Sequence, residues 1–111
     1  MKTDFLKSLL SSSGLSGFEI PVAELIKEKW ASLTDELDQS ALGSLHGLKR
    51  GSGKGHSVMI ATHMDAIGLI VSKVSGEFLH VANLGGIDIR VLPGQAVIVH
   101  SERGDLSGII A

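Results

Sequence analysis

The segment 58–68 constrains the fold of this chain more than any other part of the sequence. Residues 58–62 (Val-Met-Ile-Ala-Thr) form a short apolar run, and His63 and Asp65 follow directly at its end. A short apolar run bounded by polar residues is typical of a strand that is buried on both faces inside a parallel sheet. The sequence therefore predicts an α/β fold in which residues 57–62 form a central strand.

His63 and Asp65 are the first candidates for a functional site. In open α/β sheets, ligands and metal ions collect beyond the carboxyl ends of the strands, where these two residues are expected to lie. Neutral imidazole is a common metal ligand, and a carboxylate beside it fixes its tautomer and raises its basicity. His63 is therefore a candidate metal ligand, with Asp65 as the group that orients it. A histidine at a strand end is more often an ordinary hydrogen-bonded residue, so the pair alone does not establish a metal site.

The first 31 residues have the spacing of helices. Apolar residues recur at positions 5, 6, 9 and 10, and residues 11–14 (Ser-Ser-Ser-Gly) predict the end of a first helix. A second helix is predicted from Glu19 or Ile20 to Ala31. It tolerates Pro21 because the missing N–H falls in the first turn, where it has no helical partner.

From residue 33 onward the pattern changes to strands. Residues 33–38 and 44–49 are predicted to flank the central strand, and both helices are predicted to cover this sheet. Beyond Gly68, the sequence predicts short strands near 69–74, 78–83, 95–100 and 106–110, separated by glycine-containing turns. Short strands at this spacing are typical of a small β-barrel or sandwich. The pattern indicates an α/β opening followed by a β-rich piece.

Composition excludes several classes of function. The chain has 111 residues, of which 43% are hydrophobic, and this content is typical of a globular domain rather than a disordered segment. A net charge of −2 gives no electrostatic case for binding nucleic acid. The lack of cysteine excludes disulfides, thiolate zinc sites and cysteine nucleophiles. Acidic and basic residues in positions 1–7 lie too close to Leu9 and Leu10 for a secretory signal, and no apolar stretch is long enough for a membrane span. We therefore expect a cytoplasmic chain that binds neither nucleic acid nor membrane.

Five segments, in the same order, resemble a known family over nearly all 111 residues. The chain is similar to the N-terminal part of metallopeptidase family 42, the dinuclear-metal aminopeptidases that include glutamyl and tetrahedral aminopeptidases, some of which are called endoglucanases or cellulases. The segments are Ser16-Gly17-Phe18-Glu19, residues 49–54 (Lys-Arg-Gly-Ser-Gly-Lys), residues 61–68 around His63 and Asp65, residues 85–95 and residues 108–111. The strand region from Asp38 to Leu45 resembles the family as well.

The resemblance implies a function, a division of the chain and two site residues. His63 would bind one of two divalent metal ions, zinc or cobalt, and Asp65 would hold its imidazole. The other ligands and the general base would lie outside these residues, so the segment alone would be inactive. Residues 1–68 would be the N-terminal part of the catalytic α/β domain, and residues 69–111 the first strands of an inserted, β-barrel-like dimerisation domain. The substrates would be short peptides, and the enzyme would form homo-oligomers through the β-rich domain.

The remaining polar candidates receive structural interpretations. We expect the other four histidines to be structural or surface residues, because no spacing predicts that they converge with a third ligand: His46, His56, His80 and His100. Asp88 and Arg90 are expected to cap a turn or to form an ion pair.

Two other classes of function compete with the peptidase. A β-rich, non-enzymatic module could use its exposed strand edges for assembly or for peptide binding. Glycoside hydrolysis would need a pair of catalytic carboxylates in a sugar cleft, and nothing in the sequence supports one.

Overall fold

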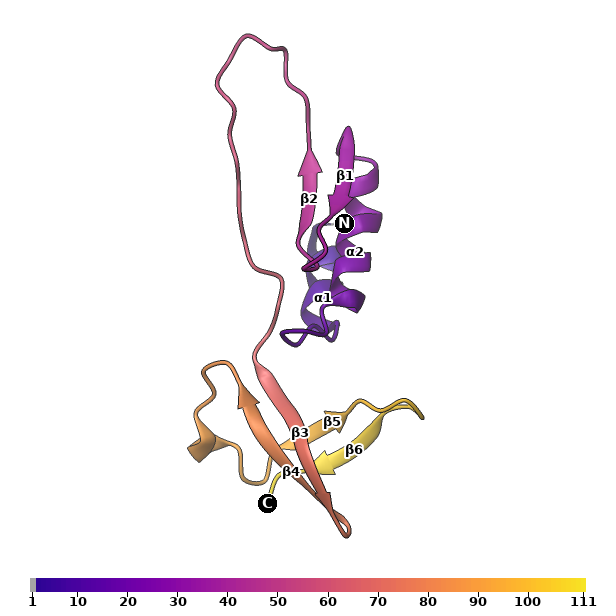
Figure 1. The fold of residues 1–111 in the computed structure, drawn as a ribbon, viewed down its shortest axis with the longest axis vertical. Coiled ribbons are helices and arrows are strands. Elements are labelled where there is room, and N and C mark those ends of the chain that lie inside the picture. The colour runs from indigo at the N-terminus through magenta and orange to yellow at the C-terminus, as the bar shows by residue number, and fades with distance from the viewer. Residues whose placement is uncertain (1) are drawn as a thin grey trace. The chain divides into compact units, whose positions relative to one another are not determined.

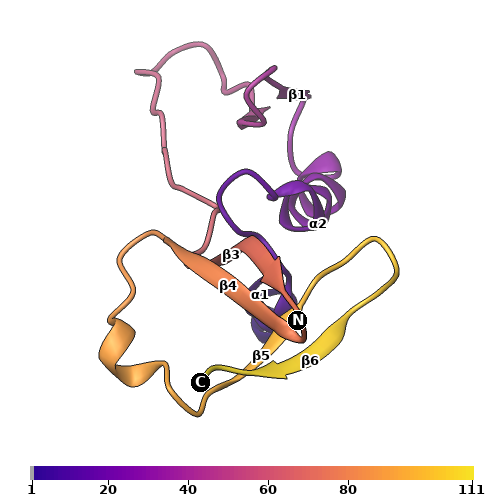
Figure 2. The ribbon, with the colours of Figure 1, turned by 60° about the horizontal axis from the view of Figure 1, so that its bottom comes forward.

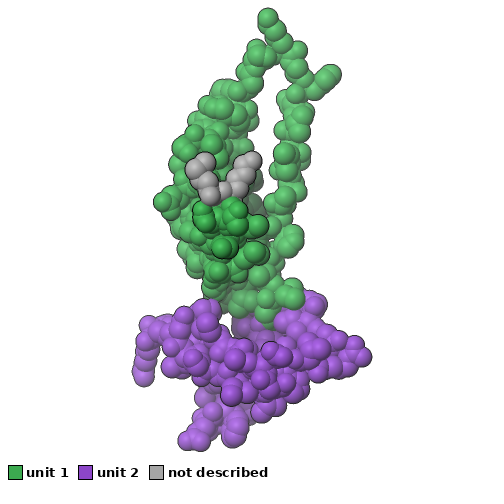
Figure 3. All heavy atoms as spheres, turned by 180° about the vertical axis from the view of Figure 1, so that it is seen from behind, with its two compact units in different colours: residues 1–68 green, residues 69–111 purple. Residues whose placement is uncertain are grey.

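A computed structural model of the chain describes residues 2–111. It divides into two compact units, the first ending at Gly68 and the second comprising Leu69–Ala111 (Figure 3). The first unit contains the helices α1 (Lys2–Ser11) and α2 (Ile20–Ala31) and the strands β1 (Glu36–Gln39) and β2 (Leu45–Leu48) (Figure 1). Neither helix of the described chain has the length and apolar character that crossing a membrane requires.

The two helices lie where the sequence predicts them. Glu19 precedes α2, and Pro21 occupies its first turn. Val22 and Ala23 on α2 are 6% and 1% exposed, and they are the only buried hydrophobic side chains in residues 2–111. The core of the first unit is therefore very small.

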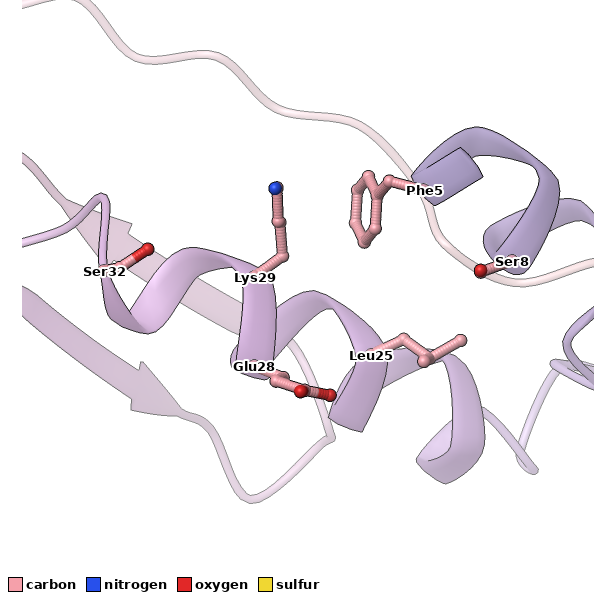
Figure 4. Close-up of a pocket in the computed structure, with 6 residues that line it drawn as sticks. All are labelled: Phe5, Ser8, Leu25, Glu28, Lys29 and Ser32. Atoms are coloured by element: carbon pink, nitrogen blue, oxygen red, sulfur yellow. The ribbon is translucent and has the colours of Figure 1, made fainter. Parts of the chain in front are cut away.

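An open hollow separates parts of α1 and α2. Phe5 on α1 and Lys29 on α2 face one another there, with the lysine Nζ 5.7 Å from the centroid of the phenylalanine ring (Figure 4). An ammonium group at this distance from a ring face is attracted by its quadrupole, weakly so at an exposed site. The contact helps α1 to stay against α2.

Strands β1 and β2 form an antiparallel hairpin in which Glu36 pairs with Leu48 and Gln39 with Leu45. The turn closes through a hydrogen bond of 2.9 Å from the Ser40 N–H to the Ser44 carbonyl. α2 packs on this hairpin at Gly47, where a Cβ atom would lie only 2.9 Å from the Trp30 ring. Glycine at this position lets the indole approach the strand backbone.

The second unit consists of two hairpins and a short 3-10 helix. β3 (Gly68–Ser75) pairs with β4 (Phe78–Leu84), and β5 (Ala96–Val99) pairs with β6 (Leu106–Ile109) (Figures 1 and 2). Gly76 has φ of +60° in the tight turn that joins β3 to β4. The four predicted strands are thus present, and they form separate two-stranded sheets rather than one closed barrel.

A 3-10 helix, η1 (Ile89–Val91), lies between β4 and β5 and was not predicted. Its cap matches the interpretation given to Asp88 and Arg90. The Asp88 carboxylate accepts from the Arg90 backbone N–H at 3.0 Å and from the Arg90 guanidinium at 2.7 Å, and this guanidinium lowers the pKa of the Asp88 carboxyl. The pair caps a turn.

The prediction of a central strand at 57–62 is wrong for this chain. The segment runs without a strand partner between β2 and β3 (Figure 1), and Val58, Met59 and Ile60 are 85%, 90% and 87% exposed. β1 and β2 pair only with each other, so they do not flank it, and the helices do not cover it. The apolar run signals a strand suited to burial, but burial also requires neighbouring strands, and residues 2–111 provide none.

Candidate functional site

His63 and Asp65 lie at the end of the exposed segment, immediately before a point where the chain is anchored. Ala66 forms an isolated parallel bridge with Leu15, in the loop between α1 and α2. The Ala66 N–H donates to the Gly14 carbonyl oxygen at 2.7 Å. This backbone pairing fixes the residues next to His63 and Asp65 against the loop.

Two glycines allow the loop to approach closely. A Cβ atom on Gly14 would lie 2.9 Å from Cγ1 of Val22, one of the two buried side chains. A Cβ atom on Gly68 would overlap the side chain of Leu15. The small residues on both sides of the bridge therefore bring the interhelical loop to the end of the 57–62 segment.

The structure brings His63 and Asp65 into contact. Nδ1 of His63 lies 3.1 Å from Oδ1 of Asp65 and 3.1 Å from the Asp65 carbonyl oxygen. A backbone carbonyl oxygen and an ionised carboxylate oxygen can accept a hydrogen bond but cannot donate one, so Nδ1 carries the proton and donates. In the neutral imidazole this leaves Nε2 with its lone pair, on a side chain that is 86% exposed. This tautomer leaves Nε2 free to bind a metal ion.

Ser16 completes the group. Its hydroxyl donates to Oδ2 of Asp65, across 49 positions of sequence. This hydrogen bond and, after it, the bond from His63 hold the pKa of the Asp65 carboxyl below its usual value of 3.8. Ser16 belongs to the Ser-Gly-Phe-Glu motif, but no pattern in the sequence predicts its contact with Asp65.

The pair borders an open cleft of about 790 Å³ in the first unit. One side of the cleft is the segment from Met59 to Asp65, and the other sides come from α2 and the β1–β2 hairpin, including Ile26 and Trp30. The cleft thus combines an apolar wall with two imidazoles, those of His46 and His63, and with the carboxylates of Glu19, Glu36, Asp38 and Asp65.

The described residues offer one metal ligand, His63, and do not complete a coordination sphere. Nowhere in the described part of the chain do three or more His, Asp or Glu side chains gather closely enough to hold a metal ion. A zinc site needs at least three protein ligands. His63 fits a ligand, and the remaining ligands of such a site would have to come from outside residues 2–111.

The other histidines do not join this group as ligands. His100 Nδ1 lies 2.8 Å from Oδ1 of Asp105, in the second unit, and both side chains are exposed. His46 borders the same cleft as His63 but belongs to no metal-binding group among the described residues. His56 and His80 are exposed.

The chain is similar in sequence to known aminopeptidases. The family model of the M42 glutamyl aminopeptidases matches residues 43–111. A lysyl aminopeptidase of Pyrococcus furiosus is 29% identical over 109 residues, which are 96% of this chain and 31% of that protein.

Solved structures agree with this similarity. An aminopeptidase from the archaeon Desulfurococcus kamchatkensis superposes with a TM-score of 0.89 and 36% identity, over 96% of this chain and 30% of that one. The solved structure of PhTET1-12s, a dodecamer in its asymmetric unit, has a TM-score of 0.83 and 30% identity, over 96% of this chain and 32% of that one. The chain spans about a third of the length of the relatives it matches.

Proposed function

The chain belongs to the M42 glutamyl aminopeptidase family, and from this premise we propose that it contributes one metal ligand to a dinuclear-metal aminopeptidase. We use "full-length peptidase" for a protein of the relatives' length that contains residues 1–111. This enzyme would remove N-terminal residues from short peptides. The observation that carries the proposal is the contact between His63 and Asp65, within the region that the family model matches, on an imidazole side chain that is largely exposed.

His63 would bind one of two divalent ions, zinc or cobalt, through Nε2. Asp65 would hold the imidazole in the required tautomer by accepting the proton of Nδ1. When bound, such ions supply Lewis acidity toward a peptide carbonyl and toward water. The chain's own contribution is to present the imidazole at the border of the open cleft of about 790 Å³.

The 111 residues alone would be inactive in this proposal. One imidazole and one orienting carboxylate do not fill a coordination sphere, so the isolated chain should bind zinc only weakly. We propose that residues 1–68 are the N-terminal part of the catalytic α/β domain. Residues 69–111 would begin an inserted dimerisation domain through which the full-length peptidase forms homo-oligomers, in line with the dodecameric arrangement named for one similar structure.

Substitution of His63 in the full-length peptidase tests the proposal. His63→Ala should lose at least one of two bound ions and most activity on an aminoacyl chromogenic substrate, because the ligand itself is removed. Asp65→Asn should retain more metal but bind it about 10–100-fold more weakly, because a neutral amide replaces the charged carboxylate that orients the imidazole. Metal content is measured by elemental analysis and activity by release of the chromophore.

A matched control removes a histidine that lies outside the cleft. His56 is exposed in the turn that follows β2, so His56→Ala should leave metal content and activity unchanged. Full metal content and full activity in His63→Ala would overturn the proposed role of this residue.

A further inference from the structure

We infer that Ser16 is a positioning residue for His63 and acts through Asp65. Its hydroxyl holds one carboxylate oxygen while the other oxygen holds the imidazole, so that Nε2 keeps a fixed direction. The inference rests on the proposed role of His63 as a metal ligand, and it assigns a role to the Ser-Gly-Phe-Glu motif.

The two oxygens of Asp65 divide the contacts between them. Oδ1 accepts from His63 at 3.1 Å, and Oδ2 accepts from Ser16. The terminal torsion of an aspartate is broad, so a carboxylate with one partner can rotate about its Cβ–Cγ bond. A second partner on the other oxygen fixes the plane of the carboxylate, and that plane sets the direction of the imidazole proton.

The backbone holds Ser16 in place for this contact. Leu15 forms the parallel bridge with Ala66, and these two residues are the direct neighbours of Ser16 and Asp65. The loop is further closed by hydrogen bonds of 2.7 Å from the Phe18 N–H to the Leu15 carbonyl and from the Gly17 N–H to Glu19 Oε1. The serine hydroxyl therefore reaches the carboxylate from a loop with a defined conformation.

The order of the three side chains argues against a nucleophilic serine. In a serine-hydrolase triad the imidazole lies between the hydroxyl and the carboxylate, because it must accept the hydroxyl proton. Here the carboxylate lies between Ser16 and His63. The imidazole has no contact through which to activate the hydroxyl, and the serine can only donate to the carboxylate.

Zinc affinity of the full-length peptidase tests the inference without depending on activity. The metal-free protein is titrated with Zn²⁺ in competition with a chromogenic chelator. Ser16→Ala should weaken binding at the His63 site by roughly 10-fold, the lower end of the range for outer partners of a metal ligand. Ser16→Thr keeps the hydroxyl at an exposed position and should restore affinity close to that of the wild type. The control Ser12→Ala removes a hydroxyl of the same loop that bonds to the Ser13 carbonyl instead, and it should have no effect.

A double substitution separates positioning from general loss of structure. If Ser16 acts only through Asp65, Ser16→Ala should add no further loss of affinity in an Asp65→Asn background. The inference is overturned if Ser16→Ala binds zinc as the wild type does, if threonine does not rescue, or if the loss persists in Asp65→Asn. A failure of the proposed function looks different, because His63→Ala would then bind zinc as tightly as the wild type.

Discussion

At the scale of single residues, Asp35 forms a clamp at the open end of the β1–β2 hairpin, and its carboxylate should titrate at unusually low pH. It accepts from Lys49 Nζ at 2.8 Å and from the Arg50 N–H at 2.6 Å, and these bonds, with that of Lys49 the larger cause, hold its pKa below the usual 3.8. Because the folded-state pKa is depressed, the clamp contributes stability that is fully present above pH 3.8 and is lost as the pH falls through the folded value. Lys49→Gln should raise the Asp35 pKa toward its usual value, which a side-chain ¹³C NMR titration measures. Lys54→Gln, in the loop beyond Arg50, is the control, and an unchanged Asp35 midpoint in Lys49→Gln would contradict the assignment.

The contact between His63 and Asp65 could be predicted from the sequence, whereas the contact of Ser16 with Asp65 could not. His63 and Asp65 are two positions apart at the end of an extended segment, so their contact is local and could be predicted. Ser16 is 49 positions from Asp65, and their contact depends on the bridge between Leu15 and Ala66. A pairing of this kind between distant segments leaves no periodic signal in either of them.

At the scale of elements, the contact of α2 with the β1–β2 hairpin depends on a missing side chain at Gly47. A Cβ atom there would lie 2.8 Å from Cγ2 of Thr34 and 2.9 Å from Cε3 of Trp30, so Gly47→Ala forces the indole or the strand to move. Overpacking of this kind costs about 1–3 kcal/mol. Gly51→Ala is the control, because a Cβ atom on Gly51 meets nothing within 4 Å. Thermal unfolding followed by Trp30 fluorescence should show a lower midpoint for Gly47→Ala than for Gly51→Ala, and equal midpoints would refute this account of the packing.

Elements were predictable where their signals are local. The helices follow from apolar spacing and from the position of Pro21, and the hairpins of the second unit follow from alternation and glycine turns. The segment 57–62 has an equally clear apolar signal and forms no strand. A hairpin strand finds its partner within a few residues, whereas a strand of a parallel sheet must find partners far along the chain.

At the scale of the whole molecule, the described residues leave most of their large apolar side chains exposed. Val22 and Ala23 are the buried hydrophobic residues, while Val58, Met59 and Ile60 are almost fully exposed. The relatives are about three times longer, and we expect the additional length of the full-length peptidase to cover this segment with neighbouring strands.

The isolated 111-residue chain should therefore self-associate through residues 57–62. An extended apolar segment with unpaired backbone groups is a template for pairing with a second copy. The double substitution Val58→Lys with Ile60→Lys places charge on one face of the segment and should shift the chain toward the monomer in light scattering. The matched control is Ile89→Lys with Val91→Lys, which adds the same charge to exposed apolar residues of η1, where there is no unpaired strand. A wild-type chain that is already monomeric at high concentration, or equal effects of the two pairs, would show that this segment does not drive association.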